Sequence, residues 1–415
     1  MKIPRWLPLL VLLSPAGQAQ LPAVAPEEAG FDPERLETVH AAARRCVEQG
    51  QHAGIVTVLA RDEKIVDFQT YGFRDRKAEL LMERDTICRI YSMTKIVTSV
   101  GALCLLEDCL FDLDDPVENY LPELTNLQVM LGGTADAPEL VEAERPVSIK
   151  DLLTHTSGFV YDFDGSSELQ KLYQQADLWS CSTLSDFVGK AGKLPLAHHP
   201  GEAFSYGINS DILGALIEKV SGKPFGVFLK ERIFDPLGMP DTSFDVAPDR
   251  RDRLAVTYRH ASEGGELEPA DALIGVWAEE GRGIESGGAG LFSTAGDFTR
   301  FAQMLCNGGN LDGVRVLGRK TIELMTANHL SSLPKPYHSY DPSKGFGLGV
   351  EVTVDLGRGA APSSLGQFGW YGAATTYCQI DPKERIVAIA FVQHFPFNEH
   401  GFLQKWTTGY FQALK

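Results

Sequence analysis

Hydrophobic residues recur at helical spacing between Arg89 and Leu106, and the interpretation of the whole chain begins from this stretch. The residues with this spacing are Ile96, Val97, Val100, Leu103 and Leu106. They predict a buried helix with Ser92 in its first turn and Lys95 one turn later on the same face. A hydroxyl and an amine are therefore predicted to lie together at a helix N-terminus.

Strand-like runs of β-branched and aromatic residues lie near both ends of the chain. Two early runs, 54–60 and 64–71, surround a polar turn and predict a hairpin. Later runs cover 287–292, 345–354, 373–380 and 386–392, and a turn at 381–384 joins the last two. These patterns predict an α/β (α+β) fold in which one antiparallel sheet combines N- and C-terminal segments and is flanked by helices.

Helical patterns flank the predicted sheet and fill the middle of the chain. They cover 33–47, 150–153, 212–220, 225–233 and 401–414. Ser148 is expected to cap the second of these helices. No strand pattern occurs from 147 to about 226, and this predicts an all-helical insert.

These elements predict two domains. A sheet domain is expected from 27–95 and 286–415, and a mainly helical insert domain from 96–285. A functional site is expected in the cleft between the sheet and the insert.

The N-terminus has the pattern of a secretory signal peptide. Lys2 and Arg5 precede an apolar run at 7–13, and small residues lead to a cleavage site after Ala19. The run is too short to cross a bilayer. We therefore predict removal of residues 1–19, export to the periplasm or the medium, and no membrane span.

Composition and charge exclude one class of partner. The 415 residues are 44% apolar and 22% charged, as in an ordinary globular protein with a large core. Loss of Lys2 and Arg5 takes the formal net charge from -17 to -19. Such an acidic protein repels phosphate backbones, so nucleic acid is not an expected partner.

Cysteine and histidine spacing predicts neither a disulfide framework nor a metal site. An odd total of seven cysteines leaves at least one unpaired. Those in apolar segments, where a thiol packs as a small hydrophobe, are Cys88, Cys104, Cys306 and Cys378. Cys-x-x-Cys and His-x-x-x-His do not occur, and His198 and His199 lack a third ligand nearby in the sequence. No metal and no cofactor are therefore predicted.

The Ser92 and Lys95 pair has the composition of a catalytic unit. A serine hydroxyl needs a proton acceptor before it attacks, and a partly desolvated amine beside a positive helix end has a lowered pKa. Ser332 and Lys335 have the same spacing, but Pro334 excludes a helix there. Spacing alone also fits a capping serine with a solvated lysine, so the remaining sequence must decide.

Six sequence blocks together resemble the serine β-lactamase-related family, which contains class C β-lactamases, DD-peptidases and family VIII esterases. The blocks occur in the family's order over nearly the whole predicted mature chain. They read YSMTK (91–95), LFDLDDPV (110–117), LLTHTSG (152–158), PGEAFSY (200–206), FDPLGM (234–239) and SGGAGL (286–291). The resemblance implies a β-lactamase/transpeptidase-like fold.

The resemblance also implies three catalytic residues. Ser92 corresponds to the acyl-enzyme nucleophile, Lys95 to its proton-transfer partner and Tyr206 to the tyrosine of the second motif, Tyr-x-Asn in β-lactamases. Here Ile208 occupies the third motif position and Asn209 follows it, so the amide-binding role does not carry over directly. A phenol that faces an ammonium is expected to have a pKa below its usual value of about 10 and to relay protons.

The third motif, Lys-Thr-Gly in β-lactamases, aligns with Trp370, Tyr371 and Gly372. The resemblance implies an edge strand beside the substrate here. It also implies an oxyanion hole formed by the N–H groups of Ser92 and Ala373, a contribution of about 3 kcal/mol per donor. Family VIII esterases often have Trp-Gly-Gly, so Trp370 is esterase-like. Tyr371 is expected to narrow the acyl pocket or to offer its hydroxyl to the substrate.

The missing motif lysine favours neutral substrates. β-Lactams and D-Ala-D-Ala peptides carry a carboxylate that Trp370 cannot pair, although Arg282 or Lys335 are alternative cations. We therefore predict an exported serine hydrolase that cleaves small carboxylic esters through acyl-Ser92. The alternatives are a β-lactamase, a D-amino-acid peptidase or an acyltransferase of the same family, and a non-catalytic binding protein on that scaffold. His155 is expected to be a structural hydrogen-bonding residue.

Overall fold

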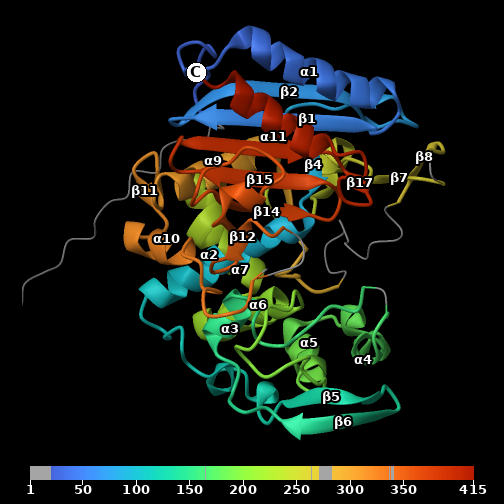
Figure 1. The fold of residues 1–415 in the computed structure, drawn as a ribbon, viewed down its shortest axis with the longest axis vertical. Helices are drawn as coiled ribbons and strands as arrows, with labels where there is room; N and C mark the ends of the chain where they lie inside the picture. The colour runs from blue at the N-terminus through green and yellow to red at the C-terminus, as the bar shows by residue number, and fades with distance from the viewer. Residues whose placement is uncertain (1–19, 164, 263, 271–282, 336, 338–340) are drawn as a thin grey trace, which may run out of the picture.

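The computed structural model describes residues 20–163, 165–262, 264–270, 283–335, 337 and 341–415. One part of the molecule is a sheet with helices on both faces, and the other is a group of helices that ends in a hairpin (Figure 1). The predicted signal peptide and Arg282 lie outside the described residues. Among the helices that are described, none has the length and apolar character needed to cross a membrane.

An eight-stranded antiparallel sheet forms the centre of the first part. Its strands, in spatial order, are β12 (Lys344–Phe346), β13 (Glu351–Thr353), β14 (Phe368–Gly372), β15 (Thr376–Asp381), β16 (Ile386–Phe391), β1 (Gly54–Arg61), β2 (Lys64–Asp75) and β3 (Leu80–Leu81). β16 pairs with β1, with Val56 opposite Phe391 and Arg61 opposite Ile386. The prediction of one sheet built from both ends of the chain is therefore confirmed, as is the early hairpin.

Helices cover both faces of this sheet. α1 (Pro33–Glu48) and α11 (Phe402–Ala413) pack on one face, as predicted, and α9 (Ala295–Cys306) packs on the other (Figure 1). Residues 54–60 of β1 are all buried, because alternate side chains enter a different helical layer. This double burial explains why the central strands are apolar throughout rather than alternating.

α2 (Thr94–Glu107) is buried on all sides and connects the two parts. Every residue from Thr94 to Leu105 is buried, and the helix packs against α6 (Asn209–Ser221) and α7 (Phe225–Leu229). Gly101 permits this approach, since a Cβ there would lie 2.8 Å from the Leu229 side chain. A helix that is apolar all round is stable only in such a position.

The middle of the chain is mainly helical, as predicted. α3 (Ile149–Leu153) begins at Ser148, whose side chain forms a capping box with Asp151. The predicted helix at 212–220 is confirmed as part of α6, and that at 225–233 is α7 followed by one π-helical turn. The boundaries of the two domains stay a prediction.

The insert is not all-helical, and that prediction is wrong for two segments. β5 (Gln128–Thr134) and β6 (Ala137–Glu142) form a hairpin, and β7 (Tyr258–His260) pairs with β8 (Leu267–Pro269). β6 is exposed along almost its whole length. An exposed strand has no alternating apolar pattern, so periodicity could not identify it.

Two of the later strand predictions are corrected. Residues 287–291 form a turn, and the strand that follows is β9 (Phe292–Thr294), which pairs with β4 (Ile87–Arg89). The predicted strand at 345–354 is instead the pair β12 and β13 with a turn between them. In both places glycines that favour turns outweigh the apolar residues around them.

The resemblance implied that β14 is an edge strand. In the structure β14 lies between β13 and β15, so it is not a true edge strand. β13 pairs only with Phe368 and Gly369, however. From Trp370 to Gly372 no described strand pairs with β14 on that side, while β15 pairs with it on the other. The end of β14 therefore extends beyond its pairing with β13.

The remaining elements are short and complete the two parts. The remaining α-helices are α4 (Glu168–Ala176), α5 (Leu184–Ala191), α8 (Asp235–Leu237) and α10 (Arg319–Met325). The remaining strands are β10 (Asn310–Leu311), β11 (Val314–Arg315) and β17 (His394–Phe395). The one-turn or irregular helices are Tyr91–Met93, Val117–Asn119, Pro122–Leu124, Leu178–Ser180, Lys230–Phe234, Pro248–Arg253 and Leu356–Arg358. All seven cysteines are free thiols. Apolar packing rather than disulfide bonding therefore stabilises the fold.

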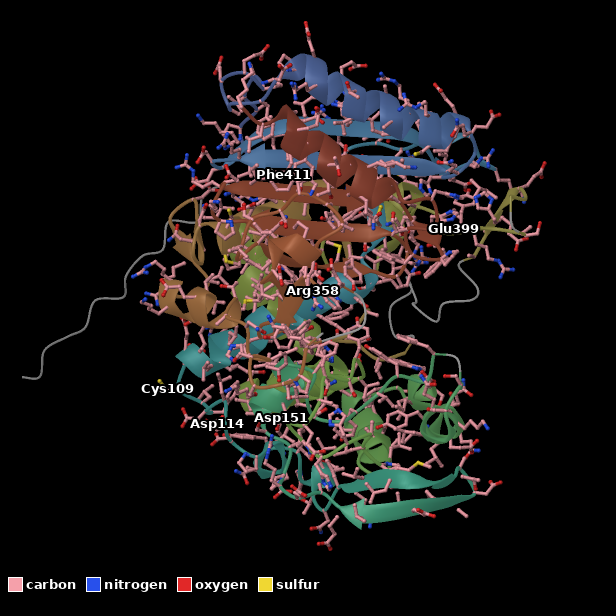
Figure 2. The ribbon with its side chains drawn as sticks, in the orientation of Figure 1. Cys109, Asp114, Asp151, Arg358, Glu399 and Phe411 are labelled. Carbon is pink, nitrogen blue, oxygen red and sulfur yellow. The ribbon has the colours of Figure 1, made fainter. Side chains whose placement is uncertain are left out.

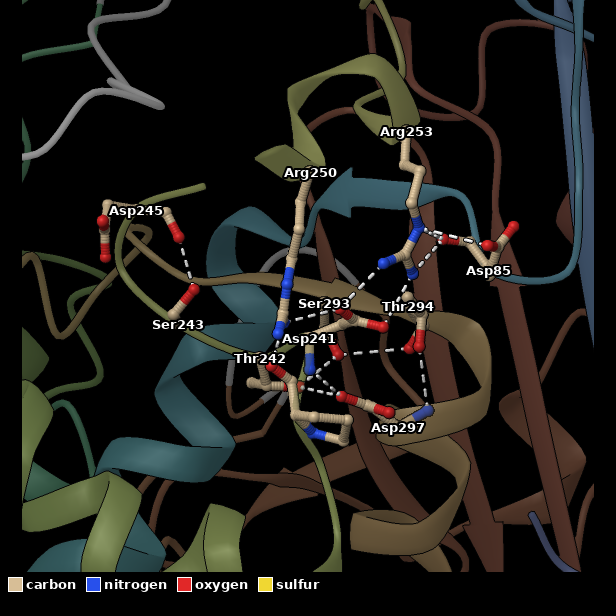
Figure 3. Close-up of polar contacts among 11 residues, drawn as sticks. Asp85, Asp241, Thr242, Ser243, Asp245, Arg250, Arg253, Ser293, Thr294 and Asp297 are labelled. Carbon is tan, nitrogen blue, oxygen red and sulfur yellow. Dashed lines mark hydrogen bonds and ion pairs between the residues drawn. The ribbon is translucent and has the colours of Figure 1, made fainter. Parts of the chain in front are cut away.

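A buried ion-pair network attaches residues 241–253 to the sheet part of the molecule (Figure 3). The Asp241 carboxylate is 4% exposed and pairs with the guanidinium groups of Arg250 (2.9 Å) and Arg253 (2.7 Å). The Asp241 N–H donates to Asp297 in the first turn of α9 (2.8 Å). Burial raises the pKa of Asp297 to about 6. Loss of either arginine would leave the buried Asp241 carboxylate with one ion-pair partner fewer.

Replacing Arg253 with Met is expected to lower the free energy of unfolding by about 3 kcal/mol, because Asp241 then keeps a buried charge with one partner fewer. Arg250→Met should cost less, since the Arg250 side chain is already 40% exposed. Urea unfolding of both variants measures the two losses. Equal losses would contradict the assignment of Arg253 as the main partner.

Candidate active site

Ser92 is presented by the one-turn helix Tyr91–Met93 at the N-terminus of α2. Tyr91 has φ +45°, in the left-handed region that bulky residues seldom adopt, so the chain turns sharply into the helix. The Thr94 hydroxyl accepts a hydrogen bond from the Leu291 N–H (3.1 Å) and ties this turn to the 286–291 block. Ser92 is half-buried and lines a cavity.

Lys95 lies against Ser92, as the helical spacing predicts. Its Nζ is 3.2 Å from Ser92 Oγ and 2.7 Å from the Gly288 carbonyl oxygen. Lys95 is 1% exposed, and this burial lowers its pKa to about 7, although the charge of Asp211 acts in the opposite direction. Near neutral pH a substantial fraction of the amine is therefore uncharged and can accept a proton.

Asp211 on α6 supports this arrangement, and sequence reasoning missed it. Its Oδ1 accepts hydrogen bonds from Ser286 Oγ (2.5 Å) and the Gly288 N–H (3.0 Å). The Gly288 carbonyl accepts a hydrogen bond from Lys95 Nζ. The buried Asp211 carboxylate therefore fixes the turn at Gly288, and this turn in turn positions the Lys95 amine. In the sequence Asp211 resembles an ordinary acidic residue in the first turn of a helix, and only its tertiary contacts distinguish it.

The glycines of the 286–291 block allow this turn to lie against α6. A Cβ at Gly287 would collide with the Ser210 carbonyl, and one at Gly288 would collide with Asp211 and the Tyr161 hydroxyl. Glycine at these two positions therefore permits the close contact with Ser210 and Asp211 of α6.

Tyr206 completes the group around the nucleophile. Its hydroxyl hydrogen-bonds to Ser92 and also accepts from Trp370 Nε1 (3.3 Å). Lys95 Nζ lies 4.7 Å from the centroid of the Tyr206 ring. The structure therefore brings Ser92, Lys95 and Tyr206 together, as the resemblance implied.

The expected lowering of the Tyr206 pKa is wrong. Burial raises the pKa of this phenol above its usual value of about 10, and the hydrogen bonds from Ser92 and Trp370 offset that effect only in part. The expectation assumed that the nearby lysine is charged, but desolvation acts on both groups. The Tyr206 phenol therefore keeps its proton near neutral pH.

His155 and Asn209 fix the loop that carries Tyr206. His155 Nδ1 accepts from the Asn209 side-chain amide (2.8 Å), and the His155 ring packs 5.0 Å from the Tyr206 ring. Asn209 also accepts a hydrogen bond from the Ser157 hydroxyl and is fully buried. Burial holds the pKa of His155 well below its usual value. His155 thus has the predicted structural contacts, and Asn209 does not line the cavity.

The end of β14 lies beside the turn that carries Ser92. A Cβ at Gly372 would collide with the Ile90 carbonyl, and the Thr376 hydroxyl donates to that same carbonyl (3.0 Å). Ala373 follows Gly372, is exposed and lines the same cavity as Ser92. Neither the Ala373 N–H nor the Ser92 N–H donates to another described residue. Both residues line the cavity.

The cavity has a volume of about 490 Å³, and its end beside Ser92 is largely aromatic. The residues that line this end are Ser92, Phe163, Tyr206, Trp370, Tyr371, Ala373 and Phe397. Tyr371 stacks on Trp370 with 4.6 Å between ring centroids and contacts Phe397 at 4.8 Å. These rings form an apolar wall of the cavity. Tyr371 is part of this wall, and narrowing of the acyl pocket by its side chain stays a prediction.

The far end of the cavity is polar but internally paired. Lys344 Nζ lies 3.5 Å from Glu351 and 2.8 Å from Thr353 Oγ, and Gln379 also donates to Glu351 (2.9 Å). Lys344 is the one cation among the described residues that line the cavity. Lys335 lies over the Tyr337 ring outside this lining, in a non-helical segment. No unpaired cation from the described chain therefore meets a substrate carboxylate here.

A protein-family model described as Beta-lactamase matches residues 39–408. The chain belongs to the Beta-lactamase family. An uncharacterized protein of Mycobacterium tuberculosis (strain CDC 1551 / Oshkosh) is 33% identical over 379 residues, which cover 87% of this chain and 90% of that protein. Lovastatin esterase of Penicillium rubens is 31% identical over 300 residues, covering 70% of this chain and 73% of the esterase.

A solved structure of EstCE1 has the same fold as this Beta-lactamase family chain. EstCE1 is described as a hydrolase with promiscuous acyltransferase activity. It superposes with a TM-score of 0.79 at 25% identity over 92% of this chain and 99% of its own. The resemblance and the fold class are thus confirmed. At the family level the relatives support a serine hydrolase or acyltransferase.

Trp370→Phe is expected to slow ester turnover about fivefold, because the Tyr206 oxygen loses one neutral hydrogen bond worth about 1 kcal/mol. Steady-state kinetics with a chromogenic ester measures the change, which should fall on kcat more than on KM. Trp406→Phe is the matched control, since Trp406 packs against Tyr377 and Tyr410 away from Tyr206. An unchanged kcat in Trp370→Phe would show that the indole N–H does not position the phenol.

Proposed function

We propose that this protein cleaves small carboxylic esters through a covalent acyl-Ser92 intermediate. The observation that carries the proposal is the convergence of two proton-handling groups on one hydroxyl. Lys95 Nζ and the Tyr206 hydroxyl both hydrogen-bond to Ser92, in a cavity with an apolar wall. A desolvated amine and a protonated phenol match the needs of a base and an acid in acyl transfer.

In acylation the neutral Lys95 amine accepts the Ser92 proton while Oγ bonds to the ester carbonyl carbon. The carbonyl oxygen becomes an oxyanion, which the N–H groups of Ser92 and Ala373 are positioned to receive. The bond to the leaving alkoxide then breaks, and Tyr206 donates its proton to that oxygen. The Lys95 ammonium returns a proton to the phenolate.

In deacylation a water molecule replaces the leaving alcohol. Its proton passes to the same base, its oxygen bonds to the acyl carbon, and Ser92 recovers its proton as the acid is released. No further group is required for the proton balance. Asp211 and His155 act through position only, because they hold the Gly288 turn and the Tyr206 loop.

Neutral esters fit the cavity better than substrates with a carboxylate beside the scissile bond. Lys344 is already paired with Glu351, and Trp370 occupies the position of the motif lysine. A carboxylate placed there would be desolvated without a partner, which is costly. This favours an ester substrate over β-lactams or D-amino-acid peptides.

Acyl transfer to an alcohol is a second candidate, favoured by the similarity to EstCE1. An alcohol that enters where water would enter accepts the acyl group from Ser92 by the same steps. Addition of a small alcohol to the ester assay, with both products quantified, separates the two outcomes. An ester product that rises with alcohol concentration at the expense of the free acid would establish transferase activity.

The central test compares wild type with Ser92→Ala on p-nitrophenyl butyrate. We expect turnover in wild type and loss of at least about a thousandfold in the variant, because Ser92 is the hydroxyl to which Lys95 and Tyr206 both hydrogen-bond. Equal rates would disprove an acyl-Ser92 intermediate. Intact-mass labelling with a fluorophosphonate distinguishes a non-catalytic binding protein, which should take up no adduct. Nitrocefin in the same panel tests the β-lactamase alternative.

The pH dependence follows from the lysine. Burial lowers the pKa of Lys95 to about 7, and only the neutral amine is a base. We therefore expect kcat/KM to rise about tenfold per pH unit below 7 and to level off above it. Lys95→Arg should abolish this profile together with the activity, because a guanidinium stays protonated. A wild-type profile that is flat from pH 5 to about 8 would exclude Lys95 as the base.

A further inference from the structure

Four side chains from distant parts of the chain converge at the end of the sheet where β7 meets β17. They are His260, His394, Glu399 and His400, and one ligand atom from each lies within 4.8 Å of all the others. Figure 2 labels Glu399 on the side of the sheet from which β7 and β8 extend. The group is separate from Ser92 and takes no part in the proposed reaction.

The pairing of strands brings these residues together. β17 lies parallel to β7, with His394 opposite Tyr258, so His394 and the last residue of β7, His260, are near neighbours. Glu399 and His400 lie just before α11, whose cap Gly401 has φ +64°. The ligands therefore come from two segments about 130 residues apart. Local spacing predicted no metal because it could not detect such a set.

The separations suit one tetrahedral ion. Glu399 Oε2 lies 2.8 Å from His394 Nε2 and 3.7 Å from His400 Nε2, and His400 Nε2 lies 3.1 Å from His260 Nε2. Ligands bound to zinc at about 2.0 Å in a tetrahedron are about 3.3 Å from one another. Three of the contacts are already near that value. The widest separation must contract by up to about 1.5 Å, which side-chain rotation can supply.

Hydrogen bonding outside the cluster presents the correct ring nitrogen. His260 Nδ1 lies 2.7 Å from the Gly265 carbonyl, which can only accept, so Nδ1 carries the proton and Nε2 of the neutral ring keeps its lone pair. An imidazole N–H donated to a backbone carbonyl is the usual support of a metal-binding histidine. Within the cluster, His260 Nε2 lies at hydrogen-bond distance from His400 Nε2. Both atoms are ring nitrogens, so one of the two must carry a proton for this hydrogen bond to form.

A second observation concerns buried nitrogens without partners. His394 Nδ1 is fully buried and has no hydrogen bond to a described residue. His52, two residues before β1, packs 4.9 Å from the His394 ring and 5.4 Å from the His400 ring, and neither of its nitrogens has a described partner. Because His394 Nδ1 has no described partner, Nε2 is the nitrogen through which His394 meets the other ligands, at 2.8 Å from Glu399 Oε2.

We propose that His260, His394, Glu399 and His400 bind one Zn²⁺ ion. Three imidazoles and one carboxylate supply four protein ligands and leave no open position, and a closed site of this kind is structural rather than catalytic. The ion would join the hairpin of β7 and β8 to the segment that precedes α11.

The site has a structural connection to the active site. The His394 N–H donates to the Ala374 carbonyl (3.0 Å), and the Thr375 hydroxyl donates to the His394 carbonyl (2.9 Å). The Asn398 N–H donates to the Thr375 hydroxyl (2.8 Å). A metal on His394 and Glu399 therefore holds the backbone that positions the turn after Ala373. Zinc binding is independent of the proposed reaction, so either proposal can fail alone.

The test uses tag-free protein stripped with a chelator and titrated with zinc by calorimetry. We expect one equivalent of Zn²⁺, a zinc-dependent rise in Tm, and the visible absorption of tetrahedral cobalt when Co²⁺ replaces zinc. His260→Ala should weaken zinc binding at least about a hundredfold, and Glu399→Gln, which keeps the shape of the side chain, about tenfold or more.

His329→Asn is the matched control, because His329 bonds a backbone carbonyl on α10 far along the chain from the cluster. It should bind zinc like wild type. Absence of stoichiometric binding in wild type would overturn the proposal. So would equal zinc affinity in wild type, His260→Ala and Glu399→Gln. If His260→Ala fails to fold, the near-isosteric Glu399→Gln variant alone still decides the question.

Discussion

Exclusion of water from one amine is the constraint on which the rest of the structure depends. Lys95 is almost fully buried, and its pKa falls to about 7 because the charged form loses its hydration. Three layers keep water away: α2 itself, the Gly288 turn against α6, and the aromatic rings of Tyr161 and Tyr206. If the helical part moved away from the sheet, the amine would regain water and its proton. Packing between the two parts of the molecule therefore sets the protonation state of Lys95.

The site is assembled by backbone contacts between segments that are remote in the sequence. The Thr94 hydroxyl accepts a hydrogen bond from the Leu291 N–H, and the Thr376 hydroxyl donates one to the Ile90 carbonyl. These two bonds fix Ser92 between the glycine turn and the end of β14. Glycine is needed at 288 and 372 for the same reason, because any side chain there would collide with the neighbouring segment. Position, rather than unusual side chains, distinguishes this serine from Ser332.

Much of this arrangement could be predicted where the signal is local. Helical spacing placed Ser92 beside Lys95, alternating and apolar runs identified the hairpin of β1 and β2, and sequence blocks identified Tyr206 and Trp370. Properties that arise from burial could not be predicted. The role of Asp211, the raised pKa of Tyr206 and the hairpin of β5 and β6 each depend on what lies around a residue and not on its neighbours in the chain.

The pairing of β1 with β16 also has a consequence for the order of biosynthesis. The first strand of the chain, β1, has as its partner a segment that leaves the ribosome more than 300 residues later. Until then the hydrophobic edge of β1 is open, and neither the end of β14 nor the turn after it exists beside Ser92. The arrangement around Ser92 can therefore form only after residues 368–391 have been synthesised.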